Sequence, residues 1–70
     1  MKVTCRLRQP NKPSTSAVLD FPLLPHKGDL INPDEHGNGI HGYVEDVVWV
    51  YDNEKDGYYP FLVIKVYGAD

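Results

Sequence analysis

The sequence predicts an all-β fold, a small and partly open antiparallel barrel of five strands. Three observations favour this class. Apolar and polar residues alternate with a period of two in most of the chain, and glycine or proline stands at nearly every break. No segment keeps the apolar spacing of an amphipathic helix over two turns. With 70 residues, the chain is expected to form a single domain, residues 1–70.

The first two strands are expected at residues 2–8 and 16–21, paired as a hairpin. In the first, Val3, Cys5 and Leu7 alternate with polar or charged residues, as in a strand with one face in the core. The segment QPNKPSTS between them is rich in proline and small polar residues and predicts a loop. In the second strand, the residues that share the core face are Ala17, Leu19 and Phe21.

The stretch FPLLPHKGDLI, residues 21–31, predicts a corner of the barrel. Its two prolines cannot donate to a strand ladder, so the chain must leave the sheet there. Leu23 and Leu24 are expected to plug one end of the core, and Gly28-Asp29 to turn into a short strand at residues 29–32. The polar segment that follows, residues 32–42, predicts an exposed and mobile loop anchored by Ile40 alone.

A long hairpin is expected from strands at residues 42–52 and 58–67, joined by NEKDG. If Tyr51 faces Tyr59, then Trp49 faces Phe61, and Glu45 meets the opposite charge of Lys65. This register predicts an aliphatic core face made of Val44, Val48, Val50, Leu62, Ile64 and Val66.

The same register gathers aromatic residues on the opposite face of the hairpin, and these are the candidate binding residues: Tyr43, Trp49, Tyr51, Tyr59, Phe61 and Tyr67. Protein interfaces are enriched in such rings because they bury a large area at little cost in side-chain entropy. Three alternatives stay open at this point. The face is covered by the first hairpin, by a different protein, or by a second copy of the chain.

No arrangement of residues predicts catalysis, and the chain is not expected to be an enzyme or to hold a cofactor. Ser14, Thr15 and Ser16 lie in the expected loop without a base fixed near them. The single cysteine excludes an internal disulfide and a zinc site built on cysteine pairs. No metal site is expected either, because His36 and His41 share a glycine-rich loop that enforces no geometry.

The net charge of −3 disfavours binding to a phosphate backbone. Stacking aromatic side chains nevertheless keep a nucleic-acid site open as an alternative. No apolar run is long enough to span a membrane, and the N-terminus alternates where a signal peptide would be continuously apolar. We therefore expect a cytoplasmic protein.

The order of an N-terminal hairpin, LPHKGDLI, YVEDVVWVY and FLVIKVY resembles small SH3-like barrel proteins of bacteria and phages, over residues 17–67. The resemblance implies the fold and no particular chemistry. Our leading hypothesis is a non-catalytic protein-interaction module, such as an accessory protein of a phage or mobile element, that binds a protein through the aromatic face. A binder of single-stranded nucleic acid or nucleotides and a structural homo-oligomer are the alternatives.

Overall fold

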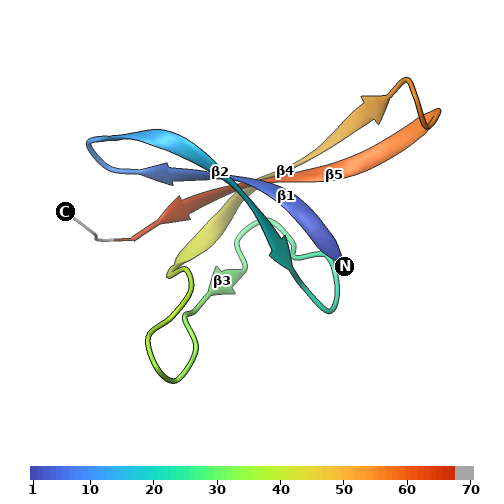
Figure 1. Ribbon diagram of the computed structural model, residues 1–70. Helices are drawn as coiled ribbons and strands as arrows, with labels where there is room; N and C mark the ends of the chain where they lie inside the picture. Colours follow the sequence, from blue (N-terminus) through green and yellow to red (C-terminus); the bar gives the residue numbers. More distant parts are fainter. Residues whose placement is uncertain (68–70) are drawn as a thin grey trace.

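The computed structural model describes residues 1–67, and these form one five-stranded sheet without a helix. The strands are β1 (Lys2–Gln9), β2 (Lys12–Asp20), β3 (Leu30–Ile31), β4 (Gly42–Asp52) and β5 (Gly57–Val66). Their order in the sheet is β2-β1-β5-β4-β3, and the sheet curls into a half-barrel (Figure 1). The predicted all-β class and partly open barrel are confirmed. Within the described residues, no helix is long and apolar enough to cross a membrane.

The sheet is mixed, so the expectation of a purely antiparallel barrel is wrong in one respect. Strands β1 and β5 pair in parallel, with Thr4 opposite Phe61 and Arg8 opposite Lys65. The pairs β1–β2, β3–β4 and β4–β5, by contrast, are antiparallel. Short turns force neighbouring strands to run in opposite directions. Because β1 and β5 come from opposite ends of the chain, no turn sets their direction.

The β1–β2 hairpin closes with a tight turn at Pro10 and Asn11, and the predicted longer loop is wrong. Gln9 already pairs with Lys12, so β2 starts four residues earlier than expected. Proline presets the first central position of such a turn, and Asn11 adopts the positive φ of 60° needed at the second. Pro13 is tolerated because β2 is an edge strand.

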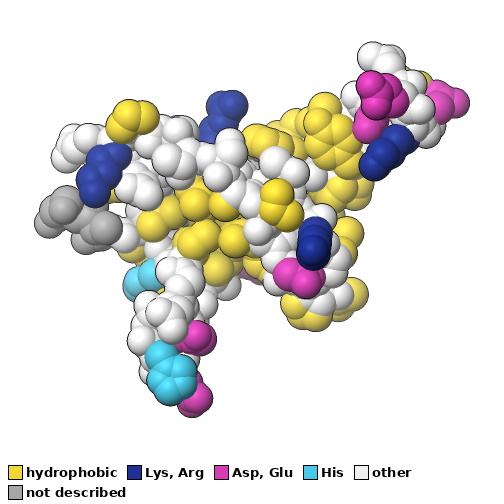
Figure 2. All heavy atoms as spheres, viewed as in Figure 1, with side chains coloured by type: hydrophobic (Ala, Val, Ile, Leu, Met, Phe, Trp, Pro, Cys, Tyr) yellow, Lys and Arg dark blue, Asp and Glu magenta, His cyan; other side chains and the backbone are white. Residues whose placement is uncertain are grey.

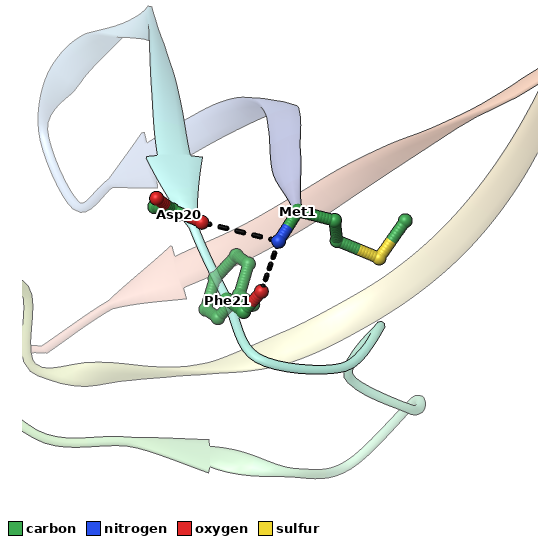
Figure 3. Close-up of polar contacts among 3 residues, drawn as sticks. All are labelled: Met1, Asp20 and Phe21. Carbon is green, nitrogen blue, oxygen red and sulfur yellow. Dashed lines mark hydrogen bonds and ion pairs between the residues drawn. The ribbon is translucent and has the colours of Figure 1, made fainter.

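The N-terminal amine fastens the beginning of β1 to the end of β2 (Figure 3). It donates to Asp20 Oδ1 at 3.1 Å and to the Phe21 carbonyl oxygen. The Phe21 amide in turn donates to the Met1 carbonyl oxygen at 2.8 Å. These contacts extend the β1–β2 ladder by one step and hold Phe21 where its ring packs against the core.

The corner between β2 and β3 is hydrogen-bonded to β4 on both sides of Val44. The Gly28 amide donates to the Val44 carbonyl at 2.8 Å, and the Val44 amide donates to the Asp29 carbonyl at 3.0 Å. Gly28 has a φ of 92°, which residues with a side chain rarely adopt. Leu24 packs against the core as expected, but Leu23 is 80% exposed, so only one of the two leucines plugs the barrel.

The core lies on the inner face of the curled sheet and is small. Its fully buried members are Val3, Cys5, Val44, Leu62 and Ile64. They come from β1, β4 and β5, and partly buried side chains from β2, the corner and the following loop pack around them. Burial raises the pKa of the Cys5 thiol, because the thiolate is poorly solvated there.

The loop between β3 and β4 projects from the sheet and is organised by one aspartate (Figure 1). Asp34 Oδ1 accepts hydrogen bonds from the amides of His36 and Asn38, at 2.9 and 2.8 Å. Ile40 packs against the core, so its predicted role as an anchor is confirmed. The mobility of this loop stays a prediction. No group of three or more potential metal ligands occurs among residues 1–67.

Candidate protein interface

A β-bulge in β4 sets the geometry of the long hairpin. Val44 pairs with Ile64, whereas Asp46 pairs with Val63, so Glu45 is an extra residue in β4. Beyond the bulge, Tyr51 lies opposite Tyr58. The predicted register, with Tyr51 opposite Tyr59, is therefore wrong by one residue.

This one-residue difference divides the predicted aromatic face between the two sides of the sheet, because directly paired residues share a side. Trp49 and Tyr51 pair with Pro60 and Tyr58 and lie on the inner face with Leu62. Three other predicted residues, Tyr43, Tyr59 and Phe61, lie on the outer face. Tyr67 follows β5, and its ring lies 5.7 Å from that of Tyr43.

The predicted aliphatic face is corrected in the same way. Val44, Leu62 and Ile64 are fully buried, as expected. Val48 and Val50 pair with Phe61 and Tyr59, so they lie on the outer face instead of in the core. The sequence thus identified the centre of the core and misplaced the residues beyond the bulge.

The distal part of the hairpin, residues 48–60, projects from the half-barrel and is called the arm here (Figure 1). Strand β1 pairs with β5 only from Phe61 to Lys65, and β3 pairs with β4 only at Gly42 and Tyr43. Pro60 lacks an amide hydrogen and stands directly before the β1 ladder begins. Within residues 1–67, the arm is therefore a two-stranded ribbon with no strand on either side.

Both faces of the arm carry large apolar side chains. On the inner face, Trp49 is 56% and Tyr58 is 69% exposed, and the Tyr51 and Tyr58 rings meet edge to face at 5.3 Å. On the outer face, Val48 and Tyr59 are also exposed. Figure 2 shows hydrophobic side chains extending from the centre of the molecule along the arm. An isolated two-stranded hairpin is marginal in water, so such a ribbon benefits from a covering partner.

The tip of the arm is acidic and well ordered by hydrogen bonds. Asp52 Oδ1 accepts from the amides of Glu54 and Lys55, at 2.9 and 3.4 Å. Asp56 has a φ of 50° and accepts a hydrogen bond from the Tyr51 hydroxyl. That bond favours the neutral phenol and raises the pKa of Tyr51.

A notch lies where the arm leaves the sheet, between the beginning of β1 and the free half of β5. It is an open cavity of about 470 Å³ that extends along the arm from its base to its tip. Its lining residues are Lys2, Thr4, Asp52, Lys55, Gly57, Tyr58, Tyr59, Pro60 and Phe61. The Arg6 guanidinium lies 5.8 Å from the centre of the Phe61 ring. Lys2 and Arg6 thus place two basic side chains at the base of the arm, whereas the tip carries three acidic side chains and Lys55.

Glu45, the bulge residue, forms an ion pair that the sequence did not predict. Arg8 Nη1 lies 2.9 and 3.1 Å from the two Glu45 carboxylate oxygens. The expected pair of Glu45 with Lys65 is wrong, because Lys65 lies opposite Tyr43. Arg8 instead reaches across β5 from β1. Predicting this contact would have required knowledge of the parallel β1–β5 pairing.

Sequence reasoning missed Tyr58, which is the most exposed aromatic residue of the arm. Its omission followed from the register, which placed it outside the aromatic face. The four-residue turn from Asn53 to Asp56 was the available signal, because Asp56-Gly57 suits a positive φ at the end of such a turn.

A comparison with known proteins gives no relative: no family model, curated protein or solved structure matches this chain.

Proposed function

We propose that this chain is a non-catalytic protein-interaction module that binds a protein partner through the arm. One observation carries the proposal: in the described part of the chain the arm has no neighbouring strand, yet it exposes aromatic and branched side chains on both of its faces. Exposed apolar surface of this kind, with free strand edges, is typical of protein docking sites.

The resemblance to SH3-like barrel proteins supports the finer parts of this proposal. It favours an accessory protein of a bacterium, phage or mobile element, and the lack of a long apolar run in the sequence favours a place in the cytoplasm. The parallel pairing of β1 with β5 counts against the SH3-like classification, because the resemblance concerned an antiparallel barrel.

The proposal is tested by asking whether the arm's aromatic residues stabilise the isolated chain. Trp49→Ser and Tyr58→Ser should each change the free energy of unfolding by about 1 kcal/mol or less in urea titrations of dilute protein. Leu62→Ala is the matched control from the core and should cost several times more. Equal losses in all three variants would mean that the arm belongs to the core, and the proposed site would be lost.

A second measurement separates protein binding from nucleic-acid binding. Trp49 is the only tryptophan, so its fluorescence reports directly on the inner face of the arm. Adding an oligothymidylate at low salt should leave that emission unchanged, because the acidic tip repels phosphates. Saturable, salt-sensitive quenching would overturn the choice of a protein partner.

A further inference from the structure

The chain exposes more surface than a monomer of its mass should. A compact monomer of 7.9 kDa is expected to expose about 4,400 Å². This chain exposes 5218 Å², and its extents are 39 × 27 × 18 Å. The excess of several hundred Å² has the order of the ≈800 Å² that each partner buries in a standard interface.

Charge differs between the two ends of the arm. Three acidic residues and one lysine occupy the tip, namely Asp52, Glu54, Lys55 and Asp56. At the base, Lys2 lines the notch and Arg6 lies over Phe61. Within residues 1–67, neither Lys2 nor Arg6 forms an ion pair, whereas Arg8 and the N-terminal amine do. Figure 2 shows acidic side chains gathered at the far end of the arm.

These two ends complement each other in a second copy of the chain. If two arms lie side by side in opposite directions about a twofold axis, each acidic tip meets the basic base of the other copy. The opposite arrangement, with the arms parallel, would bring the two acidic tips together and is disfavoured. A twofold axis also doubles every favourable contact, since the same surface is used on both copies.

The notch gives each arm a place to bind. From Gly57 to Phe61 the free half of β5 spans about 13 Å, so an opposed arm of equal length reaches from tip to base. The notch lies on that path and offers an open cavity of about 470 Å³ beside Tyr58 and Phe61. Aromatic side chains of the partner's arm therefore have an apolar surface to cover.

We propose that the partner bound by the arm is a second copy of this chain, in a twofold dimer whose two arms lie antiparallel with each acidic tip against the other copy's Lys2 and Arg6. This inference rests on the proposed function and names the partner for it. Tyr58, Tyr59 and Phe61, which line the notch, become buried between the two copies.

Sedimentation velocity between about 1 and about 500 µM tests the dimer directly. The expected result is a monomer at the lowest concentration and a dimer at the highest. A monomer throughout the range overturns the dimer. Such a result leaves the stability test of the arm unaffected, so the two proposals fail separately.

Charge reversal tests the arrangement of the arms. A base variant, Lys2→Glu with Arg6→Glu, should be monomeric because two negative regions then meet. A tip variant, Glu54→Lys with Asp56→Asn, should be monomeric because two positive regions meet. An equimolar mixture of both variants should restore the dimer, since each contact then joins opposite charges.

The control is Lys12→Glu, which reverses a charge at the β1–β2 turn and should leave the dimer intact. Circular dichroism of each variant verifies that it folds, and the tip variant alone tests the proposal if the base variant does not. Dimers in both variants alone, or a mixture that stays monomeric, would overturn the antiparallel arrangement. Binding of a different protein by monomeric chain would identify another occupant and equally overturn it.

Discussion

The two halves of strand β5 have the same kind of sequence, but one half lies between two strands and the other has a strand on one side only. From Phe61 to Lys65 it lies between β1 and β4, and it contributes the buried Leu62 and Ile64. From Gly57 to Pro60 it has β4 on one side only, and Tyr58 and Tyr59 are exposed. Both halves are rich in residues that favour strands. The comparison teaches that burial here depends on which distant strand lies alongside, and not on the local apolar content.

The largest expected effect is the loss of a side chain from the inner half of β5. Leu62→Ala or Ile64→Ala should lower the free energy of unfolding by about 2 to 5 kcal/mol, because each leaves a cavity in a core of few residues. Urea denaturation measures the loss. Leu30→Ala, at a site 66% exposed, is the matched control and should have little effect. Similar midpoints for Leu62→Ala and Leu30→Ala would contradict the assignment of the core.

The sequence predicted the inner half of the hairpin better than the arm for a physical reason. Before the bulge, the predicted register is wrong by two residues, because it implies Val44 opposite Val66 and Val44 in fact pairs with Ile64. An even shift leaves each residue on its own side of the sheet, so Val44, Leu62 and Ile64 were still assigned to the core. Beyond the bulge, the predicted register is wrong by one residue, and this odd shift exchanges the two sides of β4 relative to β5. Neither neighbour of Glu45 in the sequence is a glycine, so no glycine marked the position of the extra residue.

The parallel pairing of β1 with β5 could not be predicted from local patterns. Period-two alternation in β1 is equally compatible with either direction of its neighbour. The contact of Arg8 with Glu45 depends on that pairing, and so does the notch beside Lys2. The sequence therefore predicted the residue types of the candidate site and the hairpin that carries them. It predicted neither the face on which each residue lies nor the basic residues nearby.

A somewhat smaller effect is expected at the start of β4, where the hairpin packs most closely. A Cβ on Gly42 would lie 2.2 Å from the Lys65 carbonyl oxygen and 3.1 Å from Val66 Cα. Both atoms belong to the backbone, so Gly42→Ala must shift one strand, at a cost of about 1 to 3 kcal/mol. Thermal denaturation measures this cost. Gly57→Ala, whose nearest atom would lie at 3.9 Å, is the control. Equal midpoints would show that β4 and β5 separate more easily than their pairing indicates.

The ion pair across β5 should have a smaller effect again. Arg8→Met removes the partner of Glu45, but the Arg8 side chain is 56% exposed and solvent screens the interaction. The expected loss is about 1 kcal/mol or less, and it should shrink at high salt. Lys12→Met provides a control without an ion pair among the described residues. A loss that is large and independent of salt would mean that Arg8 stabilises the sheet by packing.

The smallest global effect is expected at the tip of the arm, where the Tyr51 hydroxyl donates to Asp56. Tyr51→Phe removes this bond, so the turn should open more often and its amides should exchange severalfold faster. The global midpoint should stay unchanged, because within residues 1–67 the tip contributes no residue to the core. Tyr58→Phe is the control, since its hydroxyl has no hydrogen-bond partner in the described part of the chain.

The hydrogen bond between Tyr51 and Asp56 should make the opening of the tip depend on pH, and the direction of the pKa shift gives the direction of this dependence. Because the hydrogen bond raises the pKa of Tyr51, the bond is present below the ordinary tyrosine pKa and is lost as the pH rises through the raised value. Exchange at the tip should therefore increase at alkaline pH in the parent chain and not in Tyr51→Phe, after correction for intrinsic exchange rates. If Tyr51→Phe instead lowers the global midpoint as much as Arg8→Met does, the arm and the base unfold as one unit. The contrast between the two halves of β5 would then concern exposure alone and not stability.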